Sequence, residues 1–271
     1  MNRPRTALAL GAMAWLVCTV APLARATDSG VSRVTLANGL RVVLAPDSAA
    51  TAADVAVWYA TGARSEKPGL SGMTRLFERL MFRGSAGVPD GEHRRRIHAQ
   101  GGLANTTTTA DYSCFWQTVP GEAVGLALQL EADRMAGLRP SAAALGEERR
   151  ALVGDRRAAA QRAPIARGLA ALYATVFAGQ SYGRPLLGAE GDLDRVTLRD
   201  IDAWRKERYL PTNAVLTIVG RFEPVATLQR VRQAFGSLPK GAVLQSARMA
   251  APSAPRRRFE LSDSPARLLF V

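Results

Sequence analysis

Histidine and cysteine are almost absent from this sequence, with two of each in 271 residues. The histidines, His93 and His98, are spaced so that on a helix they point to different sides, which keeps them from sharing a metal ion. Cys114 is the only cysteine after Cys18 and has no second thiol to pair with. We therefore expect His93 and His98 on the surface of a helix, Cys114 half-buried in an edge strand, and no cysteine-dependent catalysis.

Lysine is also nearly absent, and aromatic residues make up only 6% of the chain. Arginine therefore supplies most of the formal net charge of +13. The densest clusters, residues 94–96 and 256–258, are not interleaved with aromatic side chains as a groove for nucleic acid would be. We expect no nucleic acid among the partners of this chain, while attraction to an acidic partner stays open.

Long apolar runs are missing except at the N-terminus. Arg3 and Arg5 precede an apolar stretch over residues 7–20, and Ala24-Arg25-Ala26 comes shortly after it. A basic start, a short apolar run and a small-x-small site are typical of a secretory signal peptide, here residues 1–26. We expect a periplasmic protein with no transmembrane segment in the mature chain and, with one mature cysteine, no intrachain disulfide.

The remaining pattern favours an α+β domain. Residues 34–44 read as two strands about an Asn-Gly turn, and apolar spacing at Leu76, Phe77, Leu80 and Met81 predicts a helix with one buried face. Further predicted strands span residues 54–60, 106–119 (one strand or a hairpin) and 213–219. Further predicted helices span residues 92–100, 122–135, 141–162, 197–208 and 224–235. Ser141 is expected to cap one of these helices, and Thr197 with Asp200 to form a capping box on another.

The helix over residues 74–82 carries an unusual pattern of charge. Arg75, Glu78 and Arg79 have the spacing of the inverted zinc motif H-x-x-E-H, in which two histidines bind the metal and the glutamate activates water. Arginine cannot replace histidine as a ligand, because its guanidinium stays protonated and has no free lone pair. The alternative is that these three residues form only an exposed ion-paired helix face.

The surrounding segments carry a resemblance to a known family. Residues 59–85, the glycine pair and strand of residues 101–120, the helix containing 130–135, and the segments 182–185, 198–209 and 213–220 resemble, in order, the pitrilysin/insulinase family of zinc peptidases. The resemblance spans residues 31–241. It implies a two-layer domain over residues 27–241, with a mainly antiparallel sheet packed against helices. It also implies a linker over residues 242–255 and the truncated start of a second, similar domain over residues 256–271.

The resemblance also places the remaining site residues. The third ligand position of the family, a glutamate, falls on Asp155, so Arg75, Arg79 and Asp155 replace all three ligands and only Glu78, the general base position, is kept. We therefore expect no zinc cofactor and no catalysis from Glu78. Two arginines facing two carboxylates would restore the charge balance of the family's site, so we expect Arg75 or Arg79 to form a salt bridge with Asp155.

Peptide binding is expected to be better preserved than catalysis. In the resembled family, the edge strand after the glycine pair pairs with an extended substrate through its backbone. Asn105 and Thr106 fall beside the scissile bond of such a substrate, with Thr106 at a position that is more usually alanine. The alternative is an ordinary edge strand with no ligand.

These observations leave three hypotheses for function. The first is a zinc-less partner that binds peptide or unfolded polypeptide in a heterodimer with a zinc-bearing homologue, as in bacterial heterodimers of the resembled family. The second is an active zinc metalloendopeptidase with an atypical metal site. The third is a non-functional gene fragment. An intact H-x-x-E-H homologue in the adjacent gene would favour the first, and a frameshift after Val271 the third.

Overall fold

The structure, a computed structural model, describes residues 30–162 and 164–244. The predicted signal peptide, nearly all of the predicted linker and the predicted second domain lie outside these residues. All of the described residues after Gly30 belong to one unit, which begins at Val31.

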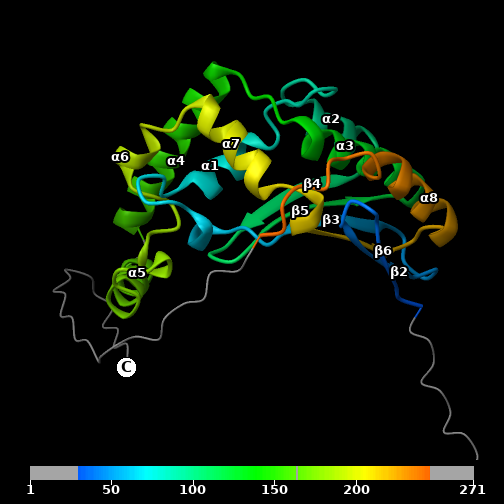
Figure 1. Ribbon diagram of the computed structural model, residues 1–271, viewed down its shortest axis with the longest axis horizontal. Coiled ribbons are helices and arrows are strands. Elements are labelled where there is room, and N and C mark those ends of the chain that lie inside the picture. Colours follow the sequence, from blue (N-terminus) through cyan, green and yellow to red (C-terminus); the bar gives the residue numbers. More distant parts are fainter. Residues whose placement is uncertain (1–29, 163, 245–271) are drawn as a thin grey trace, which may run out of the picture. The chain divides into compact units, whose positions relative to one another are not determined.

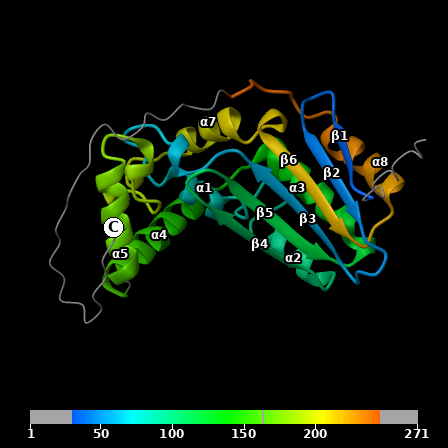
Figure 2. The same ribbon diagram turned by 90° about the horizontal axis from the view of Figure 1, so that it is seen from below.

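The centre of this unit is a six-stranded sheet (Figure 1), and its strand order β1-β2-β6-β3-β5-β4 can be followed in Figure 2. All neighbouring strands pair antiparallel except β2 and β6, which pair parallel. The predicted α+β fold with a mainly antiparallel sheet is therefore confirmed. The strands are β1 (Ser32–Thr35), β2 (Arg41–Pro46), β3 (Ala53–Tyr59), β4 (Leu103–Thr108), β5 (Ser113–Val119) and β6 (Ala214–Gly220).

The first hairpin forms where the Asn-Gly pair predicts it. Gly39 has a φ of +89°, which a residue without a side chain adopts readily. The Asn38 side chain accepts a hydrogen bond from the Leu40 amide at 3.2 Å and donates to the Phe235 carbonyl oxygen at 2.7 Å. The turn therefore joins β1 to β2 and also fastens this end of the sheet to the last helix.

Helices cover one face of the sheet and leave the other open. Along β3, Val55, Val57 and Tyr59 are buried, whereas Asp54 and Trp58 on the opposite face are exposed. Figure 2 is seen from the open face, with the strands in front and α1, α2 and α3 behind them. The helices are α1 (Met73–Leu80), α2 (Glu92–Ala99), α3 (Val124–Gly137), α4 (Ala142–Arg162), α5 (Pro164–Val176), α6 (Glu190–Leu193), α7 (Leu198–Arg208) and α8 (Pro224–Phe235).

The charged-motif helix α1 is embedded in the core. Leu76, Phe77 and Leu80 are fully buried, and the ring of Phe77 stacks on Tyr209 with centroids 4.1 Å apart. The predicted buried face of this helix is confirmed. Because α1 contacts both α4 and β4, its remaining side chains lie between the helix layer and the edge of the sheet.

Two predictions about single residues were wrong. His93 is buried rather than on the surface, because its ring packs edge-on against Phe82 at 5.3 Å, while His98 is exposed as predicted. Cys114 lies on β5, one strand in from the edge, and is fully buried there. The segment that was predicted as one strand or a hairpin is a hairpin, and only its first arm, β4, is the edge strand.

Candidate functional site

A buried carboxylate holds the N-terminus of α1. Glu66, a residue that is only 4% exposed, accepts hydrogen bonds from the backbone amides of Gly72 and Thr74, both at 2.8 Å. It satisfies two of the amides that a helix start leaves without partners. Burial raises the pKa of the Glu66 carboxyl to about 7, an effect that the hydrogen bonds from Thr74 and Gly72 oppose.

A second contact fixes this end of α1 from the opposite side. The loop between α5 and α6 donates from the Ala189 amide to the Ser71 hydroxyl at 2.9 Å, and the same hydroxyl donates to Asp192 at 2.6 Å. The backbones of Gly72 and Gly188 meet so closely that a Cβ atom on Gly188 would lie 2.6 Å from the Gly72 Cα. The N-terminus of α1 is therefore held by Glu66 and by the α5–α6 loop, independently of the charged side chains of the helix.

Arg75 holds Glu78 within α1. Its Nη1 atom donates to both carboxylate oxygens of Glu78, at 2.5 and 2.6 Å. Glu78 is only 2% exposed, so these three charged residues do not form the simple exposed helix face that the alternative describes. The carboxylate at the family's base position is engaged by a cation of the same helix.

Arg79 joins α1 to α4, as predicted. Its Nη1 atom lies 3.1 Å from Asp155, and its Nε atom donates to Glu148 at 2.7 Å. Arg83, just beyond α1, donates to the other oxygen of Glu148 at 2.6 Å and to Glu147 at 2.7 Å. The predicted pairing with Asp155 is confirmed, and the half-buried Glu148 forms the centre of the network.

Sequence reasoning missed Glu148 and Arg83. Glu148 precedes Asp155 by seven residues, which is two helical turns, so both carboxylates lie on the face of α4 that meets α1. That spacing could have identified Glu148 from the sequence. Arg83 follows Arg79 by one turn and offers the same signal.

These residues do not fit a zinc ion. Guanidinium groups occupy two of the three ligand positions, and the carboxylate at the third already pairs with Arg79. Within residues 30–162 and 164–244, no three His, Cys, Asp or Glu side chains gather closely enough to hold a metal ion.

The predicted peptide-contacting residues lie on the open edge of the sheet. Asn105 and Thr106 belong to β4, which pairs with β5 on one side only. The Asn105 side chain is exposed and accepts from the Thr106 amide at 2.8 Å, and Leu103 at the start of the strand is 66% exposed. β4 therefore presents unpaired backbone groups next to the helix that carries Arg75 and Glu78.

Arg94 adds a cation that the sequence did not point to. It lies on α2, and its guanidinium carbon is 4.1 Å from the centre of the Phe82 ring. Burial lowers the pKa of the Arg94 guanidinium, and the nearby charge of Arg134 lowers it further. This arginine was predicted only as part of a surface cluster, because its position beside α1 depends on how α2 packs.

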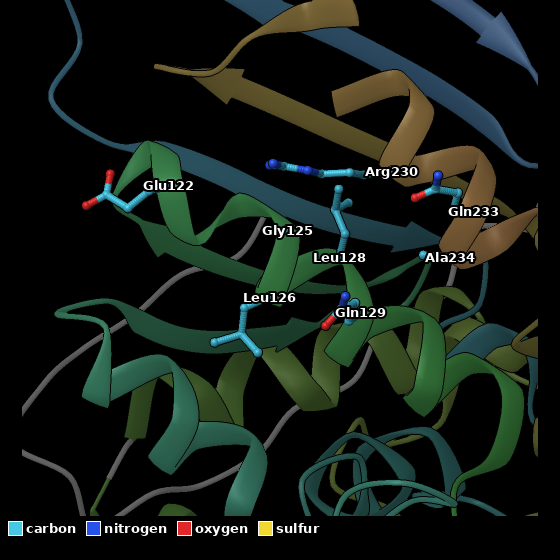
Figure 3. Close-up of a pocket in the computed structure, with 8 residues that line it drawn as sticks. All are labelled: Glu122, Gly125, Leu126, Leu128, Gln129, Arg230, Gln233 and Ala234. Carbon is cyan, nitrogen blue, oxygen red and sulfur yellow. The ribbon is translucent and has the colours of Figure 1, made fainter. Parts of the chain in front are cut away.

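A pocket of about 540 Å³ lies elsewhere, between α3 and α8 (Figure 3). Its lining mixes apolar and polar side chains, and none of them belongs to α1, α4 or β4. The lining residues are Glu122, Gly125, Leu126, Leu128, Gln129, Arg230, Gln233 and Ala234. We assign this pocket no part in the site around α1.

Comparison with known proteins matches the chain to two family profiles. Residues 41–190 match insulinase (peptidase family M16), and residues 195–267 match the peptidase M16 inactive domain. An uncharacterized zinc protease of Streptomyces coelicolor is 30% identical over 227 residues, which cover 83% of this chain and 48% of that protein. The chain spans about half the length of the curated relatives it matches.

Solved structures agree with this assignment. A protease from Helicobacter pylori superposes with a TM-score of 0.73 and 26% identity over 82% of this chain and 53% of that one. The periplasmic protease PqqL from Escherichia coli gives a TM-score of 0.75 at 18% identity, over 83% of this chain and 26% of that one. In the part of the chain that the structure describes, no helix combines the length and apolar character needed to cross a bilayer.

Proposed function

Because the chain belongs to the insulinase family of peptidases (family M16), we propose that it is a non-catalytic, peptide-binding member that works beside a zinc-bearing homologue. It would bind peptide or unfolded polypeptide without cleaving it. The zinc of the family is not expected in this chain.

The observation that carries this proposal is the ionic network at the family's ligand positions. Arg79 contacts Asp155 at 3.1 Å and Glu148 at 2.7 Å, so two ligand positions are paired with each other across α1 and α4. A divalent cation placed there would meet two guanidinium groups at short range, which repel it. The charge that zinc supplies in the family is here supplied by arginine.

The retained glutamate does not restore catalysis. Glu78 is bonded through both oxygens to Arg75, and water activation in this family depends on a metal ion beside the glutamate. A working site would need the metal first. An active metalloendopeptidase with an atypical metal site is therefore the weaker candidate.

The edge strand supports the peptide-binding part of the proposal. β4 has unpaired backbone groups along one side, and an extended peptide can pair with such a strand through main-chain hydrogen bonds alone. This mode depends little on the side chains at Asn105 and Thr106, so the change from alanine to Thr106 is compatible with it. Loss of the metal ligands leaves this strand intact.

The proposal also includes a partner subunit and a cellular location. We propose a heterodimer with a homologue that keeps the H-x-x-E-H motif, because a zinc-less chain needs a second subunit to take part in cleavage. We propose export to the periplasm on the signal-peptide pattern of residues 1–26, and one structural relative is a periplasmic protease. In this proposal, the heterodimer as a whole binds and cleaves the polypeptide substrates.

The experiment is metal analysis together with peptidase assays on purified protein that extends to the natural stop codon. The protein is assayed alone and mixed with any homologue that keeps the H-x-x-E-H motif and is encoded by an adjacent gene. We expect no stoichiometric zinc and no cleavage by this chain alone, with cleavage by the homologue raised in the mixture.

Two controls sharpen the result. Glu78→Gln in this chain should leave the activity of the mixture unchanged, whereas the same change in the homologue's motif should abolish it. Stoichiometric zinc with chelator-sensitive cleavage by this chain alone would overturn the proposal. A mixture no more active than the homologue by itself would remove the partner role.

A further inference from the structure

Arg94 lies on α2, the helix that packs against the edge strand β4. Its guanidinium lies over the ring of Phe82, and that ring is 6.4 Å from the ring of Phe115 on β5. Phe115 is the register partner of Thr106 on β4, and directly opposed residues point to the same face of a sheet. The guanidinium of Arg94 therefore lies on the helix-covered side of the sheet, close to the edge strand.

Arg94 is exposed and forms no ion pair among the residues that the structure describes, although the charges of Glu148 and Glu78 act on it from a greater distance. The other arginines of the site are paired: Arg75 with Glu78, Arg79 with Asp155, and Arg83 with Asp90. No carboxylate within residues 30–162 and 164–244 lies within ion-pair distance of Arg94. Another arginine, Arg134, lies 4.9 Å from the centre of the Phe82 ring and is itself paired with Glu131.

The adjacent arginines of the same helix differ in this respect. Arg95 and Arg96 both pair with Glu92, Arg95 at 2.6 Å and Arg96 at 3.4 Å. Helical geometry turns successive side chains by about 100°, so Arg95 lies away from Phe82. The unpaired charge is thus a property of position 94 and not of the arginine cluster as a whole.

A peptide added to β4 would bring side chains to this cation. Successive residues of an added strand point to opposite faces of the sheet, so every second side chain of the peptide lies on the helix-covered side. Ala104 and Thr106 mark that side on β4, and α2 packs against the same strand. A peptide side chain beside them is directed toward the face of the sheet that α1 and α2 cover.

We propose that Arg94 selects polypeptides with a carboxylate at the residue that lies beside Thr106 on the helix-covered face. This inference rests on the proposed docking of peptide on β4 and specifies the chemistry of the ligand. The carboxylate comes from an aspartate or glutamate side chain or from the C-terminus of the peptide. An approaching carboxylate gains a charge-assisted hydrogen bond and also relieves the repulsion between Arg94 and Arg134.

The test measures the binding of matched ten-residue peptides to the full-length protein by fluorescence anisotropy. One series, acetylated and amidated at its ends, carries a single glutamate that moves through the positions, and its partner series carries glutamine. A third series ends in free carboxylates at successive lengths, which separates the side-chain source from the C-terminal source. We expect one glutamate position, or one chain length, to bind about fivefold tighter than its neutral match.

Variants of the protein test the residue itself. Arg94→Gln should abolish the preference for glutamate, Arg95→Gln should keep it, and Arg94→Glu should reverse it toward a peptide with lysine at the same position. Arg94→Lys keeps the charge without the planar fork and should keep part of the preference.

The outcomes separate the two proposals. Equal binding of glutamate and glutamine peptides, or equal losses in Arg94→Gln and Arg95→Gln, would overturn the role of Arg94 and leave docking on β4 standing. Failure of every peptide to bind would overturn the docking proposal and the selectivity with it.

Discussion

At the scale of single residues, Arg79 joins α1 to α4 through two ion pairs. It bonds to Glu148, whose side chain is only 15% exposed, and to Asp155, whose side chain is 57% exposed. An ion pair of exposed groups contributes less than about 1 kcal/mol, whereas removing one partner of a buried pair costs more because the other charge is left without compensation.

We therefore predict that Arg79→Met lowers the free energy of unfolding by about 1–3 kcal/mol. Asp155→Asn should lower it by less than about 1 kcal/mol. Urea denaturation measures both values, with Arg95→Met on the surface of α2 as the control for loss of an arginine. Equal losses in Arg79→Met and Arg95→Met would show that the network does not hold α1 to α4.

The buried histidine makes stability depend on pH. Burial lowers the pKa of His93 to about 2, and the charges of Arg134 and Arg94 add to this effect. The unfolded chain has a histidine pKa near 6.5, so it binds a proton below that pH while the folded chain does not. The contribution of His93 to stability is therefore complete above about pH 6.5 and is lost as the pH falls from there.

We predict that lowering the pH from 6.5 to 5.5 destabilises the wild type relative to His93→Gln by about 1 kcal/mol, because the unfolded histidine is already half protonated at pH 6.5. The difference is the right quantity because the raised pKa of Glu66 acts with the opposite sign, losing stability as the pH rises toward 7. Denaturation of both proteins across this range measures it. A difference that stays constant with pH would mean that His93 is charged in the fold.

At the scale of elements, the contact of the α5–α6 loop with α1 should be sensitive to a single methyl group. Gly188 has a φ of +72°, and a Cβ atom there would lie 2.4 Å from the Ser71 carbonyl oxygen. Gly69 has a similar φ of +81°, but a Cβ atom there would meet nothing within 4 Å. The two glycines thus separate backbone strain from steric overlap.

We predict that Gly69→Ala costs about 1–2 kcal/mol, the strain of a left-handed alanine. Gly188→Ala should cost clearly more, about 3 kcal/mol or above, because backbone must move as well. Chemical denaturation measures both variants. If both variants lose the same unfolding free energy, the α5–α6 loop can move away from α1 without destabilising the fold.

The sequence predicted most elements because each has a local signal. The Asn-Gly turn, the apolar face of α1 and the capping box of Thr197 with Asp200 all appear where they were expected. Ser141 also caps α4, accepting from the Ala144 amide at 3.0 Å. Helix α5 was missed although its residues have the apolar and polar spacing of an amphipathic helix, and two of its apolar side chains, Leu169 and Tyr173, are exposed.

The sequence predicted only those site residues that align with functional positions of the family. The pairing of Arg79 with Asp155 followed from charge balance at aligned positions. Glu148 and Arg83 carried a signal in their helical spacing that was not used. Arg94, in contrast, comes to lie over Phe82 through the packing of α2, which no local pattern of the sequence encodes. The burial of His93 was missed for the same reason.

At the scale of the whole molecule, the ionic network between α1 and α4 leads to a prediction about metal and stability. We predict that a chelator leaves the thermal midpoint unchanged, because arginines balance the carboxylates of α1 and α4. The triple variant Arg75→His, Arg79→His, Asp155→Glu restores the family's donor set. Its midpoint should rise with added zinc, since a ligand that binds only the folded state stabilises it in proportion to the logarithm of its concentration.

Calorimetry with and without zinc measures this prediction, and Arg95→His serves as a control that adds a histidine away from the site. A wild-type midpoint that falls on chelation would contradict the metal-free assignment. A triple variant that folds but ignores zinc would show that the backbone around α1 and α4 no longer fits the metal.

The place of β6 in the sheet governs when the domain can fold. β6 lies between β2 and β3, so Arg41 pairs with Val215 and Tyr59 pairs with Ala214. Until residues 214–220 have been made, β1 and β2 have no partner that joins them to the rest of the sheet. Pairing between strands that are distant in sequence raises the contact order and slows folding. The entropy of closing the long loop is lost before the strand contacts that offset it have formed. The sheet therefore cannot close before residue 220 has been synthesised, so strands β1 and β2 wait for their partner while more than 160 residues of chain are added.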